Sequence, residues 1–149
     1  MDRKRHFAAL TGLGAVQRLQ VAAARAELAD AMDALAAKEE AAEASRRQLQ
    51  TSERYYEDVL AAASFDPDAM RRAGLAILVA EDRLAETRDA KHQAEAAEGA
   101  SRAEWHGHRL RARAIGEHRR RMHRKLVQTA EDKASVDLIA LAASKEAAR

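Results

Sequence analysis

Histidines are the first residues of this chain that could do chemistry, because imidazole nitrogens bind metal ions and exchange protons near neutral pH. Six are present, and four of them lie in one stretch, at His106, His108, His118 and His123. Ligands on one helix share a face only when they stand three or four residues apart, and no two of these four have that spacing. The pattern therefore predicts no metal site, and no cofactor is expected.

Paired carboxylates are the second candidate, because two neighbouring acids can divide the roles of acid and base. Glu39-Glu40 and Glu131-Asp132 are such pairs, but acid–base work needs a cleft that shifts their pKa values, and these pairs are typical of solvated faces. The chain has no G-x-x-x-x-G-K phosphate loop, no serine nucleophile motif and no cysteine. The sequence predicts a protein without enzymatic activity and without a small-molecule substrate.

The strongest electrostatic feature is the basic run at 118–125, His-Arg-Arg-Arg-Met-His-Arg-Lys. It could neutralise nucleic-acid phosphates or meet an acidic protein surface, or it could be a solvated face. Residues 102–125 hold nine Arg or Lys, whereas residues 27–58 are rich in acids, although the net charge is only +2. Because no DNA-docking fold accompanies the run, a protein partner is favoured, and nucleic acid is the alternative.

The composition predicts long helices to carry these groups. Aromatic residues are only 3% of the chain, charged residues are 34%, and Ala dominates the apolar fraction, as in coiled coils. The one proline, Pro67, follows Asp66, a residue that can cap a new helix, and Phe65 could pack on Met70 as a hydrophobic staple. We expect a helix over about 8–63, a turn at 64–66 and a helix over about 67–146, in a single elongated all-α domain spanning 1–149.

Heptad positions predict how the two helices pair. In the first helix the seam positions are Val21, Leu28, Leu35, Ala42, Leu49, Tyr56 and Ala63, with Ala24, Ala31, Lys38, Ser45, Ser52 and Val59 as companions. In the second they are Met70, Ile77, Leu84, Lys91, Glu98, Trp105, Ala112, Arg119, Leu126, Lys133 and Ala140, with companions three residues further on. The prediction is a two-helix antiparallel coiled-coil hairpin that is weakest from Lys91 to Ser101.

The C-terminal end of the second helix is expected to overhang the first. Reflection about the bend leaves roughly the last 30 residues without a partner, on the order of 40 Å of helix. Such a helix, with Leu126, Val136, Ile139 and Leu141 on it, is marginal in water, so it is predicted to be a docking element. Gly12 and Gly14 are interpreted as a late or frayed helix start.

No apolar run approaches the roughly 20 residues that cross a bilayer, so the chain is expected to be soluble and cytoplasmic. Bulky apolar residues gather near the bend, including Tyr55, Leu60, Phe65, Leu75 and Val79. They either close the hairpin or form an exposed surface that binds another protein.

Four features together resemble the FliJ/YscO family of export stalk proteins. They are the Ala- and Glu-rich hairpin, Leu49 and Tyr56 before the bend, the lone tryptophan in Ala103-Glu104-Trp105, and the closing run 131–137. The resemblance implies a non-enzymatic stalk of the bacterial flagellar or virulence type III export apparatus. It also implies an antiparallel coiled coil whose terminal ends bind the export ATPase ring, contact with the export gate near the turn, and a role in recycling export chaperones. Such a protein sits in the cytoplasm, at the inner membrane through its partners.

The resemblance also implies site residues. The export-gate contact would fall on Leu49, Tyr56, Ile77, Ala80 and Leu84, although Ser52 and Ala73 stand where aromatics are expected in that stripe. The ATPase contact would fall on Arg3, Lys4, Arg5, Arg18, Arg119, Arg120, Arg121, Arg124, Lys125 and Leu126. The alternatives are a basic nucleic-acid-binding coiled coil and a generic coiled-coil scaffold or homodimer.

Overall fold

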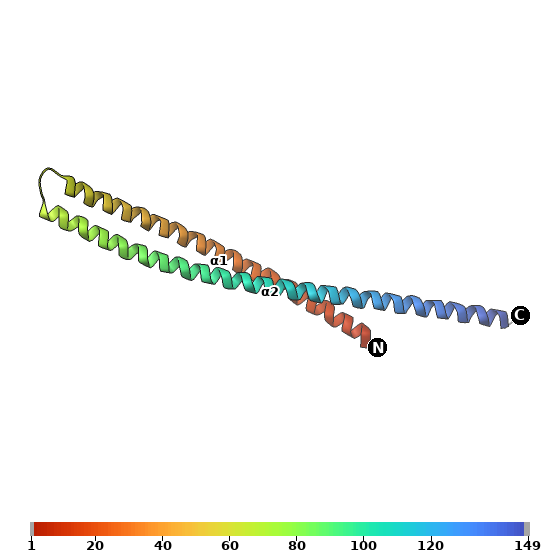
Figure 1. Cartoon of the computed structure of the whole chain (residues 1–149). Coiled ribbons are helices and arrows are strands. Elements are labelled where there is room, and N and C mark those ends of the chain that lie inside the picture. The colour runs from red at the N-terminus through yellow and green to blue at the C-terminus, as the bar shows by residue number, and fades with distance from the viewer. Residues whose placement is uncertain (1, 148–149) are drawn as a thin grey trace. The chain divides into compact units, whose positions relative to one another are not determined.

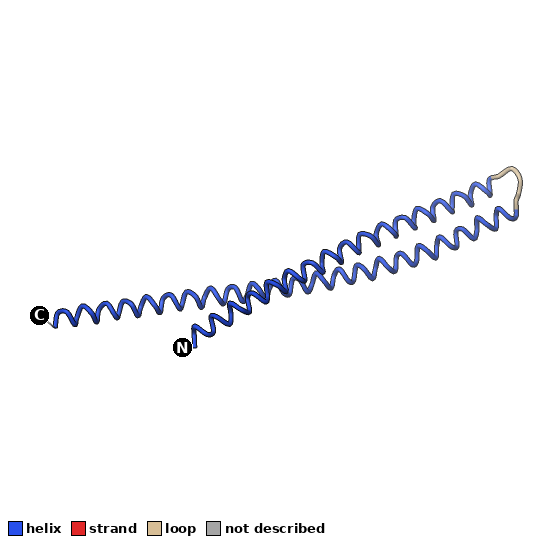
Figure 2. The backbone as a smooth tube through the Cα atoms, turned by 180° about the vertical axis from the view of Figure 1, so that it is seen from behind, coloured by secondary structure: helices blue, strands red, loops and turns tan. Residues whose placement is uncertain are grey.

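Two helices make up the described chain. The structure is a computed structural model that describes residues 2–147, with the side chains of residues 3–141, 143 and 144. Helix α1 spans Asp2–Ala61 and helix α2 spans Pro67–Ala147, and there is no strand in the described part (Figures 1 and 2). The prediction of an all-α fold with two helices packed against each other is confirmed.

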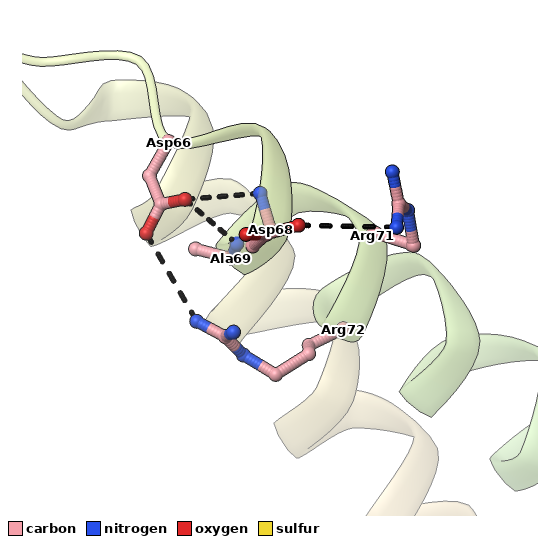
Figure 3. Close-up of polar contacts among 5 residues, drawn as sticks. All are labelled: Asp66, Asp68, Ala69, Arg71 and Arg72. Atoms are coloured by element: carbon pink, nitrogen blue, oxygen red, sulfur yellow. Dashed lines mark hydrogen bonds and ion pairs between the residues drawn. The ribbon is translucent and has the colours of Figure 1, made fainter.

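The connection at residues 62–66 ends where Asp66 caps α2. Its Oδ1 accepts hydrogen bonds from the backbone N–H groups of Asp68 and Ala69, at 2.9 and 3.1 Å (Figure 3). Pro67 then occupies the first helical position, where a missing N–H costs nothing. Phe65 is 78% exposed, so it buries little surface against Met70 and the expected staple contributes little.

The contacts of the chain group into two units. Unit 1 comprises Met1–Ala24 and Trp105–Arg149, and unit 2 comprises Arg25–Glu104. In each unit a segment of α1 packs against a segment of α2. The expectation of one elongated domain stays a prediction.

In unit 2 most of the predicted heptad positions are removed from solvent, although Lys38 and Ala63 are exposed. Ala73, Ala80 and Leu84 of α2 are 0%, 4% and 6% exposed, and Ser45 and Ser52 of α1 are also buried. The small side chains allow the two helices to approach closely, as their spacing predicted. Lys91, a charged seam residue, lies 3.7 Å from Glu39 of the other helix and 3.5 Å from Glu95 of its own helix. The part predicted to be weakest therefore holds an ion pair between the helices.

In unit 1 the same period continues to the start of α1, which begins at Asp2 rather than near residue 8. Leu10, Gln17 and Ala24 are buried, and the half-buried Gly14 lies against Ile115, whose Cγ2 would be 3.8 Å from a Cβ at position 14. Gly12 and Gly14 do not fray the helix, because packing against α2 outweighs the roughly 1 kcal/mol that each glycine costs.

The longer α1 shortens the unpaired part of α2. Arg3 donates a 3.5 Å hydrogen bond to the hydroxyl of Thr129, so contact between the helices reaches that residue. Every described side chain from residue 130 to residue 144 is exposed. The stretch without a helical partner in unit 1 thus begins near residue 130, and the expectation of about 30 unpaired residues was too long. We call residues 130–144 the C-terminal segment.

Candidate protein-interaction surfaces

All ten predicted ATPase-contact residues lie in unit 1. Arg119 and Leu126 are half-buried, and the others are exposed: Arg3, Lys4, Arg5, Arg18, Arg120, Arg121, Arg124 and Lys125. Unit 1 as a whole contains 15 Lys or Arg and 6 Asp or Glu, a formal charge of +9. The unit therefore attracts anionic partners, and the attraction falls as salt rises.

A groove in unit 1 brings three of these arginines together with two rings. It encloses about 490 Å³ and is lined by Phe7 of α1 and by Arg119, Arg120, His123 and Arg124 of α2. The Phe7 and His123 ring centroids are 5.7 Å apart, with the rings tilted by 44°. We call this the basic groove. The basic run in the sequence indicated the arginines but not Phe7, because the pairing of residues so far apart in the chain follows only once the start of α1 is known.

The guanidinium groups of the basic groove have no acidic partner within the described part of the chain. The ion pairs in unit 1 there are limited to Arg113 with Glu117, at 3.0 Å. Arg120 and Arg124 stand four residues apart and so share one face of α2. Their like charges repel each other, which favours a bound anion.

The C-terminal segment exposes apolar side chains in more than one direction. Val136, Leu138, Ile139 and Leu141 are 63%, 68%, 70% and 56% exposed. At about 100° per residue, Leu138 and Leu141 lie on one side of the helix and Val136 and Ile139 on another. Charged residues such as Asp137 also stand on this helix, but exposed apolar side chains on two sides of it cannot both be covered by one flat surface, so this segment is a candidate docking element.

The five predicted export-gate residues lie in the seam of unit 2. Ala80 and Leu84 are buried, and Leu49, Tyr56 and Ile77 are half-buried. Their heptad spacing already indicated this, since a residue that packs between two helices has little surface left for a third protein. No interface tests the assignment, so a gate contact on these residues stays a prediction.

Exposed apolar residues also occur near the turn on both helices and in the connection, and we call them together the turn patch. It consists of Tyr55, Leu60, Phe65, Leu75, Leu78 and Val79, which are between 44% and 78% exposed. A shallow groove of about 380 Å³ adjoins it, lined in part by Leu75, Val79 and Arg72. Of the two readings given above for these residues, the exposure favours a surface that binds another protein.

Among the residues that the structure describes, no group of three His, Asp or Glu is placed to hold a metal ion. His92 Nδ1 lies 3.0 Å from Glu95 Oε2, and this hydrogen bond, with help from Lys91, lowers the pKa of the exposed Glu95 carboxyl. Arg109 lies 5.3 Å from the centre of the Trp105 ring, a cation–π distance.

Comparison of the chain with protein-family models, with curated proteins and with solved structures finds no match in any of the three. No helix in the described part of the chain is both long enough and apolar enough to cross a membrane. The surfaces of the two units therefore carry the functional argument.

Proposed function

We propose that this chain is a non-enzymatic coupling protein, folded as an antiparallel coiled-coil hairpin, of the bacterial flagellar type III export apparatus. Its terminal ends, in unit 1, bind the export ATPase ring, and the turn of unit 2 binds the export gate. Recycling of export chaperones belongs to the same proposal, as does a cytoplasmic location at the inner membrane through these partners. The resemblance to the FliJ/YscO family motivates the choice of machine.

The observation that carries the proposal is the C-terminal segment. Its apolar residues point in several directions and are more than half exposed, which leaves an energetically unfavourable surface in water. A single flat partner would cover one side of such a helix, whereas the opening of a protein ring surrounds it. The basic residues that precede it in α2 would orient the approach to an acidic ring, while the apolar residues supply most of the affinity.

The turn patch supports a second, separate contact. It lies in unit 2, which contains 11 Lys or Arg and 18 Asp or Glu, a formal charge of −7. Unit 1, in contrast, has a charge of +9. Unit 1 therefore favours an acidic partner and unit 2 a basic one. A protein with two unlike binding surfaces is suited to joining two components of one machine.

The test is binding to a purified export ATPase ring with full-length variants. We expect Leu138→Asp with Ile139→Asp to weaken ring binding at least about tenfold, because a buried apolar contact becomes a buried charge. The matched control is Leu19→Asp with Leu110→Asp, which places the same charges on residues of unit 1 that are 72% and 67% exposed. All four positions are exposed, so the helical content should not change.

The turn patch is tested in the same experiment with a purified gate domain. Leu78→Asp with Val79→Asp should weaken gate binding and leave ring binding intact. Wild-type binding of the ring by the Leu138/Ile139 variant would contradict the proposal, and so would loss of both contacts in either variant.

A further inference from the structure

The basic groove of unit 1 has a composition that the proposed function does not use. A protein surface that only needed positive charge could spread it over the exposed arginines and lysines of α1 and α2. Instead three guanidinium groups and two rings line one space of about 490 Å³. This volume is within the range of small-molecule sites, which is about 300–1,000 Å³.

The charge of the groove favours a compact anion with several charges. Arg119 is half-buried and Arg120 and Arg124 are exposed, and none of the three forms an ion pair with a described residue. The planar guanidinium fork matches the oxygens of a phosphate group in a two-point hydrogen bond. A chain of phosphates would place charge against all three groups and relieve their mutual repulsion.

The two rings favour a ligand that also has a flat, unsaturated part. Phe7 is half-buried, so its position is fixed by packing, and the His123 ring is 5.7 Å from it. Nucleobases stack on aromatic side chains and on guanidinium planes, an interaction worth about 1–3 kcal/mol per base. An inorganic phosphate chain would gain nothing from these rings.

We propose that the basic groove binds a nucleoside triphosphate, with its phosphates on Arg119, Arg120 and Arg124 and its base against Phe7 and His123. The proposal is binding rather than turnover, because no carboxylate among the residues that the structure describes lines the groove to activate a water. This inference does not depend on the partners proposed above, since it concerns only the residues of the groove.

Calorimetric titration of the full chain tests the proposal with three probes in EDTA buffer: ATP, inorganic triphosphate and adenosine. We expect saturable one-to-one binding of ATP, binding of triphosphate that is several-fold weaker, and no detectable binding of adenosine. Arg120→Gln with Arg124→Gln should weaken ATP binding at least about tenfold, the effect of losing charged hydrogen bonds. The control, Arg111→Gln with Lys133→Gln, removes two charges from exposed positions of α2 outside the groove. It should change the affinity for ATP less than about threefold.

The rings have their own variants. Phe7→Leu keeps an apolar side chain in the packing, and His123→Gln changes an exposed residue, so at least one should leave the fold intact by circular dichroism. Each variant should lower the affinity for ATP to near the affinity for triphosphate. Neither should change the affinity for triphosphate itself. Equal binding of ATP and triphosphate by the wild type would overturn the proposal, and so would equal losses in the groove and control variants. A 20-nucleotide single strand that displaces ATP and binds more tightly as its length increases would assign the groove to nucleic acid instead.

Discussion

Units 1 and 2 are built on the same heptad period and use it differently. In unit 2 the most buried residues are small, with Ala73, Ala80 and Ser52 all at 5% exposure or less. In unit 1 the side chains of Gln17, Trp105 and His108 each have a buried polar atom without a hydrogen-bond partner in the described part of the chain, whereas the one such atom described in unit 2, on Glu98, lies in an ion pair with Arg102. Small buried residues in unit 2 and unpartnered buried polar atoms in unit 1 indicate that unit 2 is the more stable part, and unit 1 the part with more capacity to rearrange around a partner.

The largest expected effect tests this difference in packing. Leu84→Ala, at a residue of unit 2 that is 6% exposed, should lower the free energy of unfolding by about 2–5 kcal/mol. Leu126→Ala, at a half-buried position of unit 1, should lower it by about 1 kcal/mol. Urea unfolding followed by circular dichroism measures both, and the fluorescence of Trp105 reports on unit 1 separately. Equal losses at the two positions would remove the distinction between the units.

The second prediction concerns the cap that starts α2 in unit 2. Asp66→Ala removes the acceptor for the N–H groups of Asp68 and Ala69 and should cost about 1 kcal/mol. Asp68→Asn is the matched control, because it keeps the cap and removes only a charge near the helix start and an exposed 3.8 Å contact with Arg71. A control that costs as much as Asp66→Ala would show that charge, rather than capping, sets the stability of the turn.

The third prediction compares two glycines of unit 1. Gly14→Ala and Gly116→Ala should each stabilise the chain by about 1 kcal/mol, because alanine restricts the unfolded chain and favours helix. A Cβ at position 14 meets Ile115 at an ordinary contact distance of 3.8 Å, and a Cβ at position 116 meets nothing within 4 Å. Thermal unfolding measures both, and a loss of stability in Gly14→Ala alone would mean that the helices of unit 1 pack more closely than described.

The smallest effect is the titration of Glu95 in unit 2. Its pKa is lowered by the hydrogen bond with His92 and by the charge of Lys91, so its contribution to stability is present above the usual pKa and is lost as the pH falls through the lowered value. His92→Gln should return the pKa toward its usual value in an NMR titration of the carboxyl carbon. A pKa that does not move would assign the shift to Lys91 instead.

Much of the fold follows from the sequence because one pattern fixes it. The seven-residue period placed Ser45, Ser52 and Leu84 in the seam, and the pair Asp66-Pro67 located the start of α2. The start of α1 did not follow, because the glycines at positions 12 and 14 lower helix propensity while tertiary packing decides the outcome. Because the start of α1 was expected near residue 8, the predicted unpaired part of α2 was too long. For the same reason the sequence did not place Phe7 beside His123.

The candidate sites were less predictable from the sequence. The basic run was evident, but a groove depends on which α1 residues face it, and only the register between the helices gives Phe7. The expected gate residues were chosen by resemblance, although their heptad positions place them between the helices. The same heptad positions leave Leu75, Leu78 and Val79 outside the seam, so their exposure could be predicted, whereas the partner that they bind could not.

The composition of unit 1 also sets the order in which the protein can fold during synthesis. Residues 2–24 are made well before the residues after position 104 on which they pack, so this part of α1 leaves the ribosome before its partner exists. Unit 2 closes through one short connection and can form while translation continues, since nearby contacts lose less chain entropy. Residues 2–24 therefore have no helical partner during this time. Their leucines and valines stay accessible to chaperones until the residues after position 104 emerge.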